Sequence, residues 1–369
     1  MSLRITGLRF RDFRNYDTFA LEEIGPLTVL IGRNGVGKTN ILEGIQLLTS
    51  CESFRHPQIA QMIRQGCNTS YIEAHLADEN RQMDVALSLE TGKKRYSVNG
   101  KRKQAADVRG MLPAVTFTPD DLQLAKKSSS VKRSTLDELG MQLSRSYHVV
   151  AHDYEKALRY KNRLLKDEAS PLMVESMNDT LVTCGAQLFC YRVALFNRMV
   201  PLVEQYYERI SQSSEEFSAS YQPSWNHLLQ ESCEMGDNRL SKDEVKDLLN
   251  KSLQRFGAEE RARHRSLVGP HNDKVAFYLG GRDTSLFASQ GQQRSCVLAW
   301  KLAEVALVEQ TLGMSPVLLL DDVMSELDET RRDMLVRFVT DDMQTFITAT
   351  DLSYFNEDLL EKARVVSLP

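Results

Sequence analysis

Two motifs that ordinarily lie in one small domain are 283 positions apart in this chain of 369 residues. The first is a glycine-rich stretch, Gly32–Thr39, which follows a short apolar run and precedes apolar residues at helical spacing. The second is Asp321-Asp322, which ends the apolar run Val317–Leu320. Such a run is typical of a parallel strand that is buried on both faces, and ligands bind at the carboxyl edge of parallel sheets. We therefore expect one α/β domain built from both chain ends, with the middle of the chain inserted.

The stretch Gly32–Thr39 predicts a phosphate-binding loop. Its setting of strand, loop and helix is required by this motif, because glycines let the backbone wrap an anion while N–H groups and the helix start face it. Lys38 would bring positive charge to the β and γ oxygens, and Thr39 a hydroxyl for Mg²⁺. A chance glycine turn is the alternative, but every fixed position of the motif is present. The residues expected to bind ATP here are Gly32, Arg33, Asn34, Gly35, Val36, Gly37, Lys38, Thr39 and Asn40.

The acidic pair at the end of the second motif predicts a metal ligand and a catalytic acid or base. Asp321 ends the apolar strand, where a carboxylate can hold Mg²⁺ together with Thr39. Asp322 is placed to orient or deprotonate an attacking water. The alternative is that the two aspartates only cap a helix that begins near Met324.

A third motif, Ser289-Gln-Gly-Gln-Gln-Arg294, comes before an apolar helical run and so lies near a helix N-terminus. Such a terminus attracts phosphate, but the chain's own triphosphate is already cradled by the loop. Ser289, Gly291 and Gln292 are therefore expected to reach the nucleotide of a second copy, so that ATP binding drives a homodimer. An ordinary N-cap serine is the alternative.

The chain resembles the RecF family of bacterial recombination and gap-repair proteins, whose ATPase head is related to the ABC and SMC heads. The matching segments run from end to end: residues 8–16, 32–43, 117–122, 269–273, the serine turn and residues 317–328. The resemblance implies an ABC-type P-loop ATPase head with an inserted, mostly α-helical arm. It makes Lys38, Ser289 and Asp322 catalytic, Asp321 the Walker B aspartate, and Asp328 part of a loop that crosses the dimer interface.

Some positions depart from the wider ABC pattern. Transporter cassettes place glutamate at the catalytic acid and histidine at the switch, where this chain has Asp322 and Thr350, and the signature here is Ser-Gln-Gly-Gln. Hydrolysis is therefore expected to be slow. No glutamine occupies the metal-contacting turn near Thr118–Asp121, which leaves Gln123 as a nearby candidate.

Composition predicts a cytoplasmic protein. Hydrophobic residues make up 42% and charged residues 26% of the chain, the N-terminus has no apolar signal core, and no stretch approaches the roughly 20 apolar residues needed to cross a bilayer. The six cysteines show no Cys-x-x-Cys spacing, which favours reduced packing residues over zinc or disulfides. They are Cys51, Cys67, Cys184, Cys190, Cys233 and Cys296.

A net charge of −4 means that any contact with nucleic acid needs a local basic patch. The segment 93–103 predicts a hairpin turning at Asn99-Gly100. Phosphates would attract it without base reading, although an edge hairpin whose lysines only prevent aggregation is the alternative. The DNA-binding candidates are Lys93, Lys94, Arg95, Lys101, Arg102 and Lys103, and secondary basic candidates are Lys126, Lys127, Lys132, Arg133, Arg261, Arg263 and Arg265.

The middle of the chain predicts two antiparallel helices with a coiled-coil-like seam, one over residues 150–164 and one over 177–210 that Pro201 should kink. Residues 211–226 are predicted to be irregular, and Ser241–Glu244 to be a capping box that opens another helix. Strands return after residue 265. The expected domains are residues 1–130 and 266–369 for the head and 131–265 for the arm.

These features together predict an ATP-gated clamp on DNA, with weak, DNA-stimulated ATPase activity. The resemblance implies a role at single-strand gaps in replication and recombinational repair, a link to the SOS response, and binding to double-stranded DNA or ss/ds junctions. It also implies RecR, with RecO, as partners in loading recombinase. An ABC-type adaptor or a transport ATPase subunit is the alternative, although the inserted arm and Thr350 argue against transport.

Overall fold

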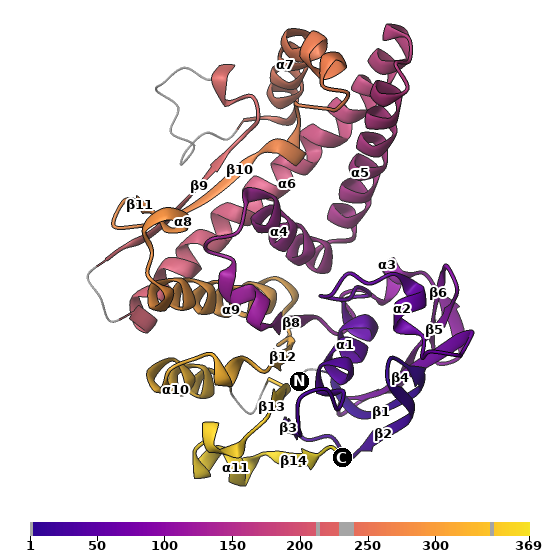
Figure 1. The fold of residues 1–369 in the computed structure, drawn as a ribbon, viewed down its shortest axis with the longest axis vertical. Helices are drawn as coiled ribbons and strands as arrows, with labels where there is room; N and C mark the ends of the chain where they lie inside the picture. Colours follow the sequence, from indigo (N-terminus) through magenta and orange to yellow (C-terminus); the bar gives the residue numbers. More distant parts are fainter. Residues whose placement is uncertain (1–2, 212–214, 229–239, 340–342) are drawn as a thin grey trace. The chain divides into compact units, whose positions relative to one another are not determined.

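The computed structural model describes residues 3–211, 215–228, 240–339 and 343–369. The chain forms two compact units, one made of Met1–Leu122 with Glu304–Pro369 and the other of Gln123–Ala303 (Figure 1). The α/β class, the head built from both chain ends and the helical insertion are thereby confirmed. In the described part of the chain, no helix is both long enough and apolar enough to cross a membrane.

The core of the first unit is a five-stranded sheet in the order β14-β3-β13-β12-β8. All of its neighbouring strands pair in parallel, and β12 and β13 are buried along their whole length because both faces are covered. This pairing brings the carboxyl ends of β3, β12 and β13 to one edge, as the sequence predicts. The strands are β3 (Leu27–Ile31), β8 (Ala114–Phe117), β12 (Val317–Asp321), β13 (Thr345–Ala349) and β14 (Arg364–Ser367).

A second, antiparallel sheet of the first unit has the order β2-β1-β4-β5-β6-β7. Helix α1 (Lys38–Thr49) contacts strands of both sheets, and β1 approaches it closely because Gly44 has no side chain: a Cβ there would lie 2.4 Å from the Phe10 ring. The predicted hairpin turn is confirmed, since Asn99 and Gly100 both have positive φ. The strands are β1 (Arg4–Phe13), β2 (Tyr16–Glu22), β4 (Thr69–Ala77), β5 (Gln82–Glu90), β6 (Lys93–Val98) and β7 (Lys101–Lys103).

Short helices complete the first unit. They are α2 (Ile59–Met62), α3 (Ala105–Val108), α10 (Glu329–Phe338) and α11 (Glu357–Lys362), with single 3₁₀ turns at Pro119–Gln123, Val323–Ser325 and Leu352–Tyr354.

The second unit contains the predicted helical arm, in which α5 and α6 pack along each other (Figure 1). Helix α6 begins at Pro171 and is continuous through Pro201, and the capping box at Ser241–Glu244 is confirmed at the start of α7. The helices are α4 (Ser129–Leu143), α5 (Arg145–Lys166), α6 (Pro171–Ser211), α7 (Lys242–Ala262), α8 (Thr284–Phe287) and α9 (Gln290–Leu312). Helix α9 begins in the second unit and ends in the first.

The prediction of an irregular stretch over 211–226 was wrong, because this stretch contains β9 (Phe217–Gln222). Its aromatic residues Phe217 and Tyr221 are spaced to face the same side and are buried, while β10 (Lys274–Leu279) supplies an antiparallel partner and pairs in turn with β11 (Arg282–Asp283). The local sequence was too polar to predict a strand, and long-range pairing with β10 determines that this segment is one.

The same sheet explains where the second unit ends. The sequence places the border of the arm at residue 265, whereas the second unit extends to Ala303. Strand β10 pairs with β9, and its Phe277 ring packs against Trp300 of α9 with a centroid separation of 5.0 Å. These contacts join residues 266–303 to the helical unit.

Five cysteines are free among the residues that the structure describes. They are Cys51, Cys67, Cys184, Cys190 and Cys296, and Cys233 lies outside the described residues.

The segment Gly269–Asp273, one of the segments that carry the family resemblance, ties the arm to the β9–β10 sheet through buried polar contacts. The Tyr154 hydroxyl of α5 is 2.6 Å from His271 Nδ1, and the Tyr221 hydroxyl of β9 donates to Asp273 at 2.6 Å. Arg192 of α6 donates to the Pro270 carbonyl at 2.7 Å. Buried polar groups are costly unless they are hydrogen-bonded, so this network specifies one arrangement of helices and sheet.

This network predicts a characteristic pH dependence of stability. Burial lowers the pKa of His271 to about 4, so this group contributes stability above its unfolded pKa of 6.5 that is lost as pH falls toward 4. Burial raises the pKa of Asp273 to about 6, which acts in the opposite direction over the same range.

Replacing either group should therefore expose the effect of the other. We expect His271→Asn to reduce the loss of unfolding free energy between pH 6.5 and pH 4, by up to about 3 kcal/mol, and Asp273→Asn to increase it. Denaturant unfolding at fixed pH values measures this loss. Equal losses in the wild type and both variants would contradict the assignment.

Candidate functional site

The loop between β3 and α1 has the backbone of a phosphate cradle. Gly35 and Gly37 have φ of 87° and 113°, values that residues with a side chain rarely adopt, and nothing lies within 4 Å of a Cβ built on Gly35. Lys38 is 6% exposed, and its Nζ donates to the carbonyls of Gly32 and Arg33 at 2.6 and 3.0 Å. The ammonium is thus held inside the loop that the sequence predicts to bind phosphates.

A compact cluster at the sheet edge joins the loop to the acidic strand. The Thr39 hydroxyl donates to Asp321 Oδ1 at 2.9 Å, and Thr348 of β13 donates to the same oxygen at 2.8 Å. Desolvation by burial raises the pKa of Asp321, and the two hydroxyl bonds oppose this rise. The structure therefore brings together the two residues, Thr39 and Asp321, that the sequence predicts as metal ligands.

Asp322 is held beside this cluster in an uncommon backbone conformation. Its φ of 52° lies in the left-handed region, and its N–H donates to Thr348 Oγ1 at 2.8 Å. Its Oδ1 atom is buried and has no hydrogen-bond partner in the described structure. Burial raises the pKa of Asp322, and the nearby Lys38 opposes the rise. A buried acceptor without a donor fits a residue that receives a hydrogen bond from water or substrate.

The donor set fits magnesium and a polyphosphate. Hydroxyl and carboxylate oxygens are ligands that Mg²⁺ prefers, and it commonly takes only one or two carboxylates plus phosphate and water oxygens. Within the described residues, no three His, Cys, Asp or Glu side chains gather as a metal site. Asp321 is buried with a raised pKa, so a neighbouring cation would offset the cost of its charge.

The other predicted nucleotide residues lie at two helix starts. Ser289 precedes α9 and makes a reciprocal cap, since Gln292 N donates to Ser289 Oγ at 3.2 Å and Ser289 N donates to Gln292 Oε1 at 2.7 Å. Gly291 is in the first turn of α9. Asp328 caps α10 by accepting from Arg331 N at 3.0 Å. Ser289 belongs to the second unit and the phosphate loop to the first.

Several residues around the loop were missed from the sequence. Thr348 was missed because its contact with Asp321 depends on the pairing of β12 with β13, while the predicted switch residue, Thr350, lies beyond the strand and is exposed. Asn15, Glu43 and Arg55 form a side-chain network with Asn40 beside the loop. Gln123, the candidate for the metal shell, opens the second unit.

The six basic residues of the hairpin differ in exposure and in whether they form ion pairs. Lys94 is partly buried with its pKa lowered by desolvation, and Arg95 pairs with Glu90. Lys93, Lys101, Arg102 and Lys103 are exposed. The exposed charge therefore concentrates on the edge strand β7 and the start of β6.

Two of the secondary basic candidates serve the interior of the second unit. Lys132 is 3% exposed and lies over the Phe277 ring at 4.5 Å, and Arg133 donates to the carbonyls of His271 and Asp273. Their charges are used in packing, so neither is available as a surface contact for DNA.

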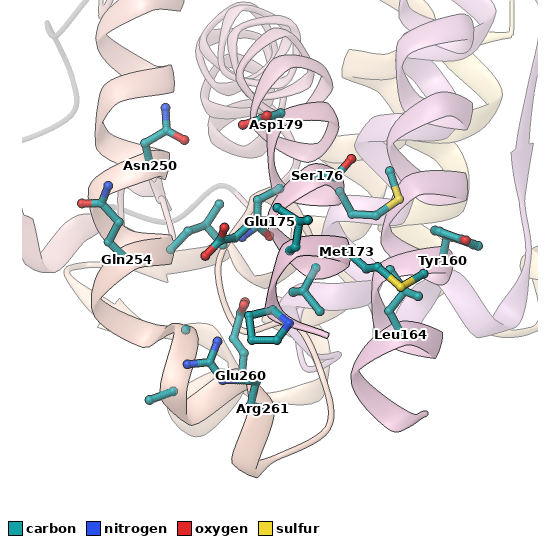
Figure 2. Close-up of a pocket in the computed structure, with 18 residues that line it drawn as sticks. Tyr160, Leu164, Met173, Glu175, Ser176, Asp179, Asn250, Gln254, Glu260 and Arg261 are labelled. Carbon is teal, nitrogen blue, oxygen red and sulfur yellow. The ribbon is translucent and has the colours of Figure 1, made fainter. Parts of the chain in front are cut away.

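A groove of about 1170 Å³ lies within the second unit, between α5, the start of α6 and α7 (Figure 2). Its wall includes Leu172 and Met173, which are 76% and 49% exposed. Apart from Arg261, none of the residues singled out in the sequence as nucleotide, metal or basic candidates lines it.

Comparison with known proteins gives a consistent result. Residues 4–366 match the family model described as the RecF/RecN/SMC N terminal domain. The chain is 35% identical to the DNA replication and repair protein RecF of Thermosynechococcus vestitus, over 99% of this chain and 95% of that protein. It is 37% identical to RecF of Symbiobacterium thermophilum, over 96% of this chain and 92% of that protein.

Solved structures agree with these relatives. A structure described as the recombination mediator protein RecF-ATP in the RecFOR pathway superposes with a TM-score of 0.84 at 27% identity, covering 96% of this chain and 94% of that chain. The corresponding RecF-ATPrS structure gives 0.87 at 25% identity with the same coverage. An Smc head from Pyrococcus furiosus, bound to the C-terminal domain of ScpA, gives 0.53 at 13% identity, covers 100% of this chain and 94% of that chain, and shows a shared fold.

Proposed function

Because the chain belongs to the RecF family of DNA replication and repair proteins, we propose that it is an ATP-driven dimeric switch that holds DNA during replication-gap and recombinational repair. The observation that carries the proposal is the cluster of Thr39, Asp321 and Thr348 beside the glycine loop. It joins the two chain ends at one point and has the ligand chemistry for Mg·ATP. The relatives favour DNA repair over the transport ATPase that the sequence left open.

Each residue of the site has a separate role in ATP binding and hydrolysis. Lys38 and the loop N–H groups bind the β and γ phosphates, and Thr39 and Asp321 would hold Mg²⁺, which supplies positive charge next to those phosphates when bound. Asp322 orients the attacking water and accepts its proton through its carboxylate. Aspartate is shorter than the glutamate of transporter cassettes, so we expect slow turnover that suits a switch.

The second copy completes the site. Ser289, Gly291 and Gln292 lie at the start of the 23-residue helix α9, where the helix dipole favours an anion. We assign this end to the triphosphate of the opposite copy and Asp328 to the same interface. ATP binding is then coupled directly to association, because nucleotide bound between two subunits stabilises the dimer by linkage.

DNA would bind the closed dimer through its basic surface and in turn stimulate hydrolysis. The exposed residues Lys93, Lys101, Arg102 and Lys103 offer backbone contacts without base reading, which suits a protein that recognises duplex DNA or a junction by shape and charge. Both solved relatives are described as RecF in the RecFOR pathway. We therefore propose RecR and RecO as partners. We also propose that the protein acts in the cytoplasm.

The hairpin provides the experiment that tests the DNA function. We expect Lys101→Glu/Lys103→Glu to weaken duplex binding by about tenfold or more at 0.1 M salt. The slope of log affinity against log salt concentration should also become shallower by about two, because each lysine neutralises one phosphate. Fluorescence anisotropy at several salt concentrations, with Mg·ATP present, measures both quantities. Lys156→Glu/Lys166→Glu makes the same charge change on the exposed face of α5 and serves as the control. Equal affinity in both double variants would remove the hairpin from the DNA site.

A further inference from the structure

We propose that Glu43 is a positioning residue that holds the turn between β1 and β2 against the phosphate loop, and thereby shapes the loop before nucleotide binds. Glu43 lies on α1, one turn beyond Lys38 and Thr39. The inference rests on the proposed function, because it concerns the same triphosphate site. It adds a residue that acts through its neighbours and touches no nucleotide.

The Glu43 carboxylate is fully buried and is surrounded by donors. Arg14 donates to it twice, from Nε at 2.8 Å and from Nη2 at 2.6 Å, and the Ser53 hydroxyl donates at 2.5 Å. The guanidinium of Arg55 is 3.8 Å away. Burying an ion pair is weak evidence for stability, because desolvation cancels much of the attraction. The bidentate geometry of the Arg14–Glu43 pair instead favours a role in orienting the Arg14 side chain.

Arg14 transmits this orientation to the turn. Its φ of 55° lies in the left-handed region, which a residue with a side chain keeps only when its surroundings over-determine it. The Arg14 N–H donates to the Met62 carbonyl at 2.8 Å, and its Nη1 donates to the Gln61 carbonyl at 2.7 Å. Glu43 fixes the other side of the same guanidinium.

Asn15, the next residue, carries the contact to the loop. Its Nδ2 donates to the Val36 carbonyl at 3.0 Å, and its Oδ1 accepts from Asn40 Nδ2 at 2.7 Å. A Cβ on Gly37 would lie 2.7 Å from Asn15 Nδ2, so the turn rests directly on the loop backbone. Asn40, predicted as a nucleotide ligand, also accepts from Arg55 at 2.8 Å and therefore links the loop helix to this network.

The consequence is a loop that is ordered in advance. A flexible loop must lose conformational freedom when it wraps an anion, and this loss weakens binding. The path from Glu43 through Arg14 and Asn15 to the Val36 carbonyl removes part of that freedom in the free protein. Breaking the path at either end should therefore loosen the same peptide and weaken the same ligand.

The test compares Glu43→Gln, Asn15→Ala and the double variant with wild type, using the full chain. Hydrogen exchange without nucleotide is expected to be about tenfold faster over residues 32–40 in each single variant. Binding of a fluorescent ATP analogue with Mg²⁺ is expected to weaken about tenfold. The double variant should be no worse than the more affected single variant, because both substitutions break one path.

Glu260→Gln is the matched control. Glu260 is also a buried carboxylate, bonded to Lys161 Nζ at 2.6 Å, but it lies in the second unit. It should lower thermal stability without changing exchange over residues 32–40. If Glu43→Gln fails to fold, Asn15→Ala decides alone, because Asn15 is an exposed side chain.

Two results would overturn the role of Glu43: unchanged exchange over residues 32–40 in Asn15→Ala and Glu43→Gln, or effects of the two substitutions that add in the double variant. Failure of the proposed function would look different. In that case the wild type itself would bind no triphosphate, while the exchange measurement would still report on the network.

Discussion

Replacing Lys38 with methionine is expected to abolish ATP-dependent self-association. The variant loses the charge that faces the β and γ phosphates, and it leaves the carbonyls of Gly32 and Arg33 without their donor. Loss of a charged hydrogen-bonding partner at this site should weaken Mg·ATP binding by about 100-fold or more. Static light scattering at nucleotide concentrations that saturate the wild type measures the association.

Lys156→Met is the matched control, because Lys156 is an exposed lysine of α5. It should dimerise with Mg·ATP as the wild type does. Full dimers of Lys38→Met at the same nucleotide concentration would show that Lys38 does not have the role given to it.

Replacing Ser289 with arginine is expected to separate binding from pairing. The helix start of α9 serves the opposite copy in our account, so the monomer should keep its affinity for Mg·ATP while a long cationic side chain blocks the interface. Loss of the cap itself should cost only about 1 kcal/mol. Ser241→Arg controls for that cost, because Ser241 is an exposed cap of α7 with the same reciprocal bonds. If monomer affinity falls as far as in Lys38→Met, the assignment to the opposite copy is wrong.

Mixing the two variants makes the test sharper. A heterodimer has one intact composite site, in which Lys38 comes from the Ser289→Arg chain and Ser289 from the Lys38→Met chain. The mixture should therefore form some dimers with Mg·ATP, whereas each variant alone forms none. A mixture that stays as monomeric as its components would contradict shared sites.

The sequence predicted those parts of the site that depend on local spacing. The glycine loop and Asp321 follow from short patterns, because a strand that ends in a polar motif places it at the sheet edge. The contact of Thr348 with Asp321 could not be predicted from the sequence, since it depends on which strands are neighbours and in which register they pair. The path from Glu43 to Asn15 was missed for the same reason: Arg14 and Asn15 lie in the turn after β1, whereas Glu43 lies on α1.

The second unit shows the same limit. Heptad spacing predicted α5 and α6, whose buried stripe includes Tyr154 and Leu181. Strand β9 has only Phe217 and Tyr221 to mark its buried face, and its place is decided by pairing with β10, more than fifty residues later. The hairpin of residues 93–103 was predicted from its turn, but the sheet decides that Lys94 is partly buried and Lys101 exposed.

The most direct test of the ATP-driven dimer is the mass of the wild-type particle without nucleotide, with Mg·ADP and with Mg·ATP, each with and without duplex DNA. We predict the 42.0 kDa chain alone in the first two conditions and a particle of twice that protein mass with Mg·ATP, with DNA favouring the dimer. A single chain at saturating Mg·ATP, with duplex present and nucleotide binding confirmed, would contradict the account.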